Sequence, residues 1–189
     1  MRLRLQTGSL HLRPVTNDDQ GLLEQIYAST RADELASTGW SPMLQASFVK
    51  SQFMAQYLHY RQHFAQGNFQ LIELELPNLP RHGKDDQPEV GLLAKHICVG
   101  RLYWTWLVAE LRLIDIALLP PFQRQGLGSQ LVLYLQQLAA AQGLPMSLHV
   151  AINNPAIALY QRLGFSVCAG DGMHHQMRWR AAATSSDEK

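Results

Sequence analysis

An apolar strand pattern, a segment with two glycines and an amphipathic helix pattern follow one another directly in the second half of the sequence. Residues 111–119 are nearly all apolar, which is typical of a central strand covered on both faces. Residues 126–142 then repeat leucine at helical spacing, and Gly143 and Pro145 mark the end of that helix. A chain that passes directly from a buried strand into an amphipathic helix packs the helix on a sheet. This feature therefore predicts an α/β protein.

Strand and helix patterns alternate through the rest of the chain, which predicts one mixed α/β domain over residues 1–180 and a flexible tail over 181–189. The predicted strands cover 10–14, 69–76, 90–93, 97–107, 111–119, 146–152, 165–168 and 173–179. The predicted helices begin after Asn17 or Asp18, cover 41–66 with Leu58 on the apolar side, and cover 126–142 and 155–163. The polar segment 77–88 is predicted to be a hairpin loop, and Gly100 a bulge within a strand.

Composition argues against several classes of function. Hydrophobic residues make up 47% and charged residues 16% of the 189 residues, which is a globular composition. Sixteen Lys and Arg against fifteen Asp and Glu leave a net charge of +1, which gives no reason to expect a nucleic-acid partner. Cys98 and Cys168 match no zinc or redox spacing, so we expect no metal and a reducing compartment. Without a signal-peptide pattern or an apolar run of ~18 residues, we expect a cytoplasmic protein that makes no membrane contact.

The segment between the central strand and its helix has the chemistry of an anion-binding loop. Residues 123–129 place two glycines at a helix N-terminus, where main-chain N–H groups converge and the helix dipole favours negative charge. A Walker-type loop would end in Gly-Lys-Ser/Thr, but Gly128 is followed by Ser129 and Gln130. A dinucleotide fingerprint would need a third glycine at Leu131 and an acidic residue in 144–152, and neither is present. A tight glycine turn without a ligand is the remaining alternative.

Two motifs in this half of the chain resemble the GNAT superfamily of N-acetyltransferases. Gln123-x-x-Gly126-x-Gly128 matches the superfamily's Gln/Arg-x-x-Gly-x-Gly/Ala signature, and 153–165 matches its C-terminal motif of an Asn, a helical Tyr and Gly-Phe. The close resemblance covers about residues 111–165, whereas the first half matches only as a pattern of elements. The resemblance implies a GNAT-like central mixed, largely antiparallel sheet flanked by helices and splayed between its fourth and fifth strands. These two strands are expected at 111–119 and 146–152, with a bulge in the former.

The resemblance also implies where acetyl-CoA would bind as a cosubstrate. The pyrophosphate would rest on the glycine loop, and the pantetheine arm would run beside the central strand and reach the Asn. A main-chain N–H near Leu118 would polarise the acetyl carbonyl. The residues implied in cofactor binding are Ile116, Leu118, Leu119, Gln123, Arg124, Gln125, Gly126, Leu127, Gly128, Ser129 and Asn153.

The resemblance implies one catalytic residue and leaves another open. Tyr160 would protonate the departing CoA sulfur, although a helical core tyrosine is the alternative. The general base would be a carboxylate or an ordered water near the splayed strands. Asp115 and Glu110 are the candidates, and a structural ion pair for Asp115 or a surface position for Glu110 are the alternatives. One of His174 and His175 would line the acceptor site, or both lie at the surface.

These observations predict an enzyme that moves an acetyl group from acetyl-CoA to a primary amine by direct transfer in a ternary complex. The alternative is a module that binds an acyl-CoA as a sensor or scaffold and has no acceptor chemistry. The acceptor is expected to be a small-molecule or peptide amine, and its identity cannot be read from the sequence. The resemblance also allows a homodimer.

Overall fold

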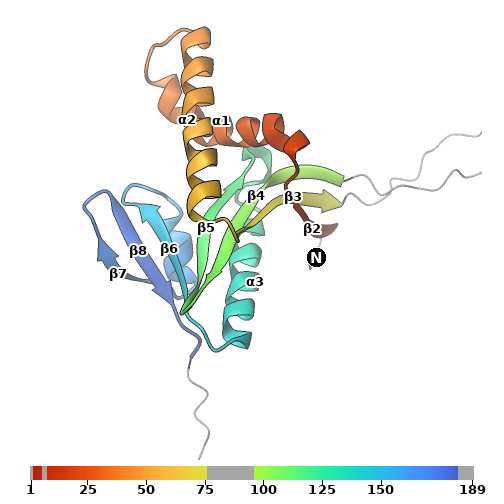
Figure 1. Ribbon diagram of the computed structural model, residues 1–189, viewed down its shortest axis with the longest axis vertical. Helices are drawn as coiled ribbons and strands as arrows, with labels where there is room; N and C mark the ends of the chain where they lie inside the picture. The colour runs from red at the N-terminus through yellow and green to blue at the C-terminus, as the bar shows by residue number, and fades with distance from the viewer. Residues whose placement is uncertain (1, 6–7, 76–95, 183–189) are drawn as a thin grey trace, which may run out of the picture.

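The computed structural model describes residues 2–5, 8–75 and 96–182, which form an eight-stranded sheet with helices on both faces (Figure 1). The order across the sheet is β1-β2-β3-β4-β5-β6-β8-β7, and every neighbouring pair is antiparallel except β5 and β6. The strands are β1 (Arg2–Leu5), β2 (Gly8–Pro14), β3 (Asn68–Glu75), β4 (His96–Leu107), β5 (Glu110–Leu118), β6 (Met146–Ala151), β7 (Ser166–Gly170) and β8 (His174–Trp179). The mixed, largely antiparallel sheet of the sequence analysis is confirmed.

Four α-helices and two short 3₁₀ helices connect the strands. They are η1 (Asn17–Asp19), α1 (Gln20–Ala36), α2 (Pro42–His63), η2 (Pro120–Phe122), α3 (Leu127–Ala141) and α4 (Ile157–Arg162). The residue that caps the first helical segment is Thr16 and not Asn17 or Asp18, and Asp19 accepts hydrogen bonds from both the N–H and the hydroxyl of Thr16. Ser41 caps α2, whose first residue is Pro42, as the sequence pattern predicted.

Two apolar cores lie on opposite faces of the sheet. α3 and α4 cover the face that carries Leu111, Leu148 and Met177, and α1 and α2 cover β3, β4 and the end of β5 on the other face (Figure 1). α2 contributes only Val49 and Phe53 as buried residues, and Leu58 is 58% exposed. The placement of Leu58 on the buried side of that helix was therefore wrong, because α2 packs on α1 and the sheet along a narrow stripe.

The predicted splay lies between β5 and β6. These are the two strands, predicted at 111–119 and 146–152, between which the sequence analysis expected it. Only three residue pairs join β5 and β6, and the last of them is Leu113 with Leu148. The register of β5 on β4 shifts at the next residue, so Ile114 is an extra, bulged residue. The bulge therefore sits where the two parallel strands begin to separate.

A second β-bulge lies in the neighbouring strand β4, where it pairs with β3. The β3–β4 register shifts so that Val99 is the extra residue, one position before the predicted Gly100. Gly100 itself is needed for close approach, because a Cβ there would lie 2.1 Å from the carbonyl oxygen of Ala117. The predicted hairpin loop 77–88 and strand 90–93 lie outside the described residues. No described helix is long and apolar enough to cross a membrane.

Candidate active site

The loop between β5 and α3 is held by its own amide side chains. Gln123 donates from Nε2 to the carbonyl oxygen of Leu118 at 2.8 Å, and Gln125 donates to that of Pro121 at 2.7 Å. Arg124 and Gly126 adopt positive φ angles of 58° and 79° and turn the chain into the helix. Gln123 of the signature therefore has a structural task, which is to tie the loop to the last residue of the central strand.

Six consecutive main-chain N–H groups at this turn are free to bind a ligand. The N–H groups of residues 124–129 bond to no acceptor in the part of the chain that the structure describes, and the next one, of Gln130, bonds to Gly126. They surround the N-terminus of α3, a 15-residue helix whose dipole adds positive potential. Such a site has the geometry and sign to hold a phosphate or pyrophosphate.

The splay exposes main-chain groups of β5 beyond the bulge. The N–H of Leu119 bonds to Val99 in β4, and its carbonyl accepts from Phe122. Because successive main-chain groups in a strand point to opposite sides, those of Ile116 and Leu118 face the space toward β6. We name this space, between β5 beyond Leu113 and β6 beyond Leu148, the slot. Its geometry favours Ile116 and Leu118 over Leu119 as binding residues.

Two residues of the C-terminal motif lie after β6, at the end of the slot. Tyr160, on α4, is 6% exposed and packs edge-on against Phe165 with ring centroids 5.9 Å apart. Burial, and secondarily the charge of Asp115, raises the pKa of Tyr160, so its phenol is fully protonated at neutral pH. Asn153 is exposed, whereas the neighbouring Asn154 caps the turn before α4 by accepting from the N–H of Ala156 at 2.8 Å.

Asp115 lies on the opposite face of β5 from the α3 core and is paired with a buried arginine. Its Oδ2 lies 2.7 Å from Nη2 of Arg101, which is 3% exposed and also donates to Gln56 at 2.9 Å. Burial, and next the charge of Asp115, raises the pKa of Tyr60 on α2. Burial raises the pKa of Tyr103, the β4 partner of Asp115 in the sheet register, to about 12.

The sequence analysis missed the residues around Asp115. Arg101 and Tyr103 alternate in β4 on the same face, and Tyr60 and Gln56 are one helical turn apart on α2. Together with other residues they line a cavity of about 10 Å³, the size of one water molecule. The sequence held one indication of this pair, which is that Arg101 lies within an apolar strand pattern. A buried guanidinium needs a carboxylate partner, and Asp115 is that partner.

Glu110, the second candidate base, lies at the other end of β5. Its Oε1 accepts from Arg112 Nη2 at 2.6 Å and from Ser147 at 2.6 Å, and its Oε2 accepts from Arg178 at 2.8 Å. Burial alone would raise the pKa of Glu110, but these hydrogen bonds outweigh it and the pKa lies below its ordinary value. Eight residues of strand, about 25 Å, separate it from Leu118. Position and partners favour a structural role.

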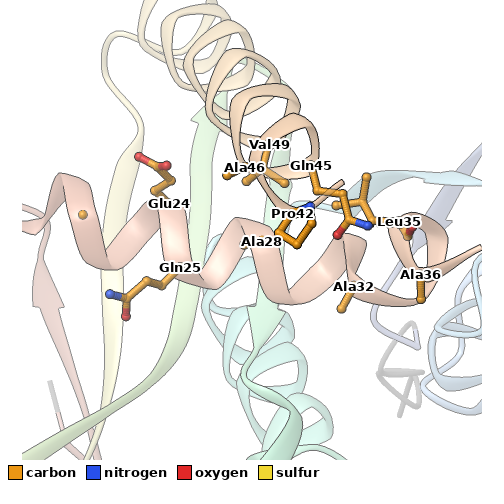
Figure 2. A pocket seen from close by; sticks show the side chains of 11 residues that line it. Glu24, Gln25, Ala28, Ala32, Leu35, Ala36, Pro42, Gln45, Ala46 and Val49 are labelled. Atoms are coloured by element: carbon orange, nitrogen blue, oxygen red, sulfur yellow. Dashed lines mark hydrogen bonds between the residues drawn. The ribbon is translucent and has the colours of Figure 1, made fainter. Parts of the chain in front are cut away.

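A groove of about 660 Å³ lies apart from the loop and the slot, between α1 and α2 (Figure 2). Small side chains such as Ala28, Ala32 and Ala46 line most of it, and Glu24 and Gln25 lie at one end. All of its lining residues belong to these two helices. Within the described residues no group of three or more His, Cys, Asp or Glu could hold a metal ion.

The solved structures that resemble this fold include acetyltransferases. The PaiA N-acetyltransferase of Thermoplasma acidophilum, in complex with coenzyme A, matches with a TM-score of 0.61 at 16% identity, over 90% of this chain and 98% of that one. A GNAT-family acetyltransferase of Listeria monocytogenes matches with a TM-score of 0.59 at 14% identity, over 95% and 99%. Naa50 of Arabidopsis thaliana, in complex with the bisubstrate analogue CoA-Ac-MVNAL, matches with a TM-score of 0.53 at 16% identity, over 90% and 97%.

Sequence comparison assigns the family. No curated protein matches the chain. The family model described as "Acetyltransferase (GNAT) family" matches residues 59–165, more than half of the sequence, from the last turns of α2 to the residue before β7. The matched range contains the glycine loop, the slot and Tyr160. This chain therefore belongs to the acetyltransferase (GNAT) family.

Proposed function

We propose that this protein transfers an acetyl group from acetyl-CoA to a primary amine, by direct attack within a ternary complex. The observation that carries the proposal is the row of free N–H groups at residues 124–129, placed at the open end of the slot. An anion site alone would bind many phosphates. An anion site that continues into a gap between two parallel strands suits a ligand with a pyrophosphate and an extended arm.

In this proposal the protein holds acetyl-CoA mainly by its main chain. The pyrophosphate accepts hydrogen bonds from residues 124–129, and the amide groups of the pantetheine arm bond to Ile116 and Leu118 as an added strand would. The exposed amide of Asn153 bonds to the same arm from the other side of the slot. The thioester then lies between β5 and β6, beyond the last pair that joins them.

The chemical step needs three things from the protein. The amine nitrogen attacks the acetyl carbonyl carbon, an N–C bond forms, and the C–S bond breaks. A main-chain N–H near Leu118 stabilises the negative charge that develops on the carbonyl oxygen. Tyr160 donates its phenolic proton to the departing sulfur, which its raised pKa permits because the proton is present throughout the neutral range.

The proton lost by the amine goes to Asp115 or to an ordered water. Oδ2 of Asp115 is buried 2.7 Å from Nη2 of Arg101 and makes no hydrogen bond within the described residues. Glu110 is left out of this step, because both of its oxygens are engaged at the far end of the strand. A cytoplasmic enzyme that acts on a small-molecule or peptide amine remains our prediction, as does the homodimer.

A panel of primary amines tests the proposal. Acetyl-CoA-dependent release of free thiol should appear with at least one amine, and mass spectrometry should show the product heavier by one acetyl group. The alternative function, an acyl-CoA-binding module, predicts that acetyl-CoA binds and that no amine releases thiol. Calorimetry with acetyl-CoA alone, run on the same preparation, separates an inactive module from a protein that does not bind CoA at all.

A further inference from the structure

One side of the sheet next to the slot is open and carries a row of hydrogen-bond donors. β6, β8 and β7 have α4 on one face, and no described helix covers their other face (Figure 1). The register places Arg112 of β5, Ser147 of β6 and Arg178 of β8 side by side on this open face. His149 lies two residues after Ser147 in β6 and therefore on the same face. His149 is exposed, and the Arg178 side chain is 39% exposed.

Arg112 and Arg178 carry two positive charges and share one carboxylate, so one positive charge is not neutralised. Glu110 is the acid beneath them, and its side chain is 8% exposed. Both of its oxygens are already engaged, one by Arg112 and Ser147 and the other by Nη2 of Arg178. Nε of Arg178 is buried without a partner, and its Nη1 makes no hydrogen bond within the described residues. One positive charge and the N–H groups of Nη1 of Arg178 are therefore left for a ligand.

His149 adds a further donor. Nη1 of Arg112 lies 3.0 Å from Nδ1 of His149, and a guanidinium can only donate, so Nδ1 must accept. The neutral ring then carries its proton on Nε2. Burial, followed by the charge of Arg112, lowers the pKa of His149, so the ring stays neutral at pH 7. The two arginines and this N–H form a row of hydrogen-bond donors, which we name the donor wall, and the amide side chain of Gln176 lies next to His149 in the sheet register.

The donor wall ends at the start of the slot. Leu148 is the last residue of β6 that pairs with β5, and His149 is the next residue, at the first position of the slot. The other acid nearby, Asp171 in the β7–β8 turn, accepts from the N–H groups of Met173 and His174 and lies 3.6 Å from Nδ1 of His174. Asp171 thus bonds within the hairpin turn, at the far end of β8 from Arg178.

We infer that the acceptor is an amine that also carries an anionic group, a carboxylate or a phosphate, which binds the donor wall formed by Arg112, Arg178 and His149. This inference rests on the proposed acetyl transfer. Carboxylate and phosphate oxygens only accept hydrogen bonds, so they match a wall that only donates. The same positive charges disfavour the protonated amine, and the amine must be neutral to attack the thioester.

Paired acceptors test this inference. Each pair keeps the amine and changes the anion: glycine with glycinamide, β-alanine with β-alaninamide, and phosphoethanolamine with ethanolamine. A charge-assisted contact of ordinary strength predicts that kcat/KM is about tenfold or more higher for the anionic member of at least one pair. The first two pairs report a carboxylate ligand and the third a phosphate ligand.

Variants locate the effect. Arg178→Gln should bring the ratio of the two kcat/KM values close to one, and Arg178→Lys, which keeps the charge, should restore part of the preference. Arg162→Gln makes the same change on α4, on the other side of the sheet, and should leave the ratio as it is. Unchanged acetyl-CoA affinity and melting temperature would show that the Arg178 variants are folded.

The outcomes separate the two proposals. If neutral amines are acetylated as fast as their anionic partners, or if Arg178→Gln keeps the full preference, the donor wall does not select the acceptor and acetyl transfer still holds. If no amine releases thiol although acetyl-CoA binds, the proposed function fails and this inference fails with it.

Discussion

The two ends of β5 use polar groups in opposite ways. At its first residue, Glu110 accepts hydrogen bonds from Arg112, Ser147 and Arg178, so the buried carboxylate is fully satisfied. Beyond its last residue, Leu118, six successive N–H groups have no acceptor in the described chain. Main-chain groups near a sheet are normally paired, so unpaired ones at a helix N-terminus form a binding site.

This difference shows which end is built for stability and which for binding. A buried carboxylate whose two oxygens both accept hydrogen bonds links three strands, and removing it leaves Arg112 and Arg178 without their shared acid. An open row of N–H groups adds little to stability, because water satisfies it until a ligand replaces the water. The expected effects of substitution should therefore separate: substitution in the glycine loop should change the affinity for coenzyme A, and substitution of Glu110 should change the free energy of unfolding.

The largest effect is expected from Gly126→Asp. The left-handed φ of Gly126 is tolerable for Asp and no atom lies within 4 Å of the new Cβ, so the variant should fold. Its carboxylate would lie among the N–H groups of the loop, and like charges cost several kcal/mol, so CoA affinity should fall on the order of 10³-fold. Gly143→Asp is the matched control, since it also has a positive φ and open space but follows the other end of α3. Equal calorimetric affinities for the two variants would contradict the pyrophosphate site.

Glu110→Gln should affect stability and leave CoA affinity unchanged. The variant leaves Arg112 and Arg178 without their carboxylate, and breaking such a buried cluster should lower the free energy of unfolding by about 3 kcal/mol at pH 7. Glu34→Gln, in an exposed pair with Arg31, should cost less than about 0.5 kcal/mol in the same urea titration.

The pH dependence of that difference has a defined sign. The pKa of Glu110 is lower in the folded protein than its ordinary value of 4.5, so its contribution is complete above that pH. It is lost as the pH falls through the folded pKa. The gap between wild type and Glu110→Gln should therefore shrink in acid, and a gap that widened below pH 4.5 would contradict the assignment.

Tyr160→Phe should slow turnover and leave binding nearly unchanged. The ring keeps its packing on Phe165, and only the proton donor is lost. Because a thiolate leaves easily, we expect the low end of the range for general acid catalysis, a fall in kcat of about 100-fold. The KM for the amine should stay nearly constant. Tyr134→Phe, on α3, is a control without an expected effect on kcat. Full kcat with weakened amine binding would move Tyr160 to the acceptor pocket.

We expect that acetyl-CoA acetylates neither cysteine. Burial raises the pKa of the Cys98 thiol, which makes it a poor nucleophile, and Cys168 lies on the exposed strand β7. Intact-protein mass spectrometry after incubation with acetyl-CoA alone should show no acetylated cysteine. An acetyl group on Cys98 or Cys168 that an amine then removes would replace direct transfer by a two-step mechanism.

The sequence predicted the parts of the site that depend on local order along the chain. The strand, the glycine loop and α3 are contiguous, and so are β6 and α4 with Tyr160, so periodicity and motif spacing were sufficient. The environment of Asp115 depends on residues from α2 and β4 that are up to 59 positions away from it, such as Gln56. The sequence placed Glu110 and Asp115 on the same strand, but their partners, which distinguish the two carboxylates, come from elsewhere in the fold. β1 was missed because four residues of alternating Arg and Leu carry little signal.

The bulge at Ile114 has a consequence for the parity of β5. Before it, the odd-numbered residues Leu111 and Leu113 face α3; after it, the even-numbered Ile116 and Leu118 do. Asp115 therefore lies on the side of Arg101 and Tyr103, whereas an unbroken pleat would turn it into the α3 core. Because of this one inserted residue, the alternation of side chains between the two faces of β5 is reversed after Ile114. Deleting Ile114 would therefore move every later side chain of β5 to the opposite face of the sheet.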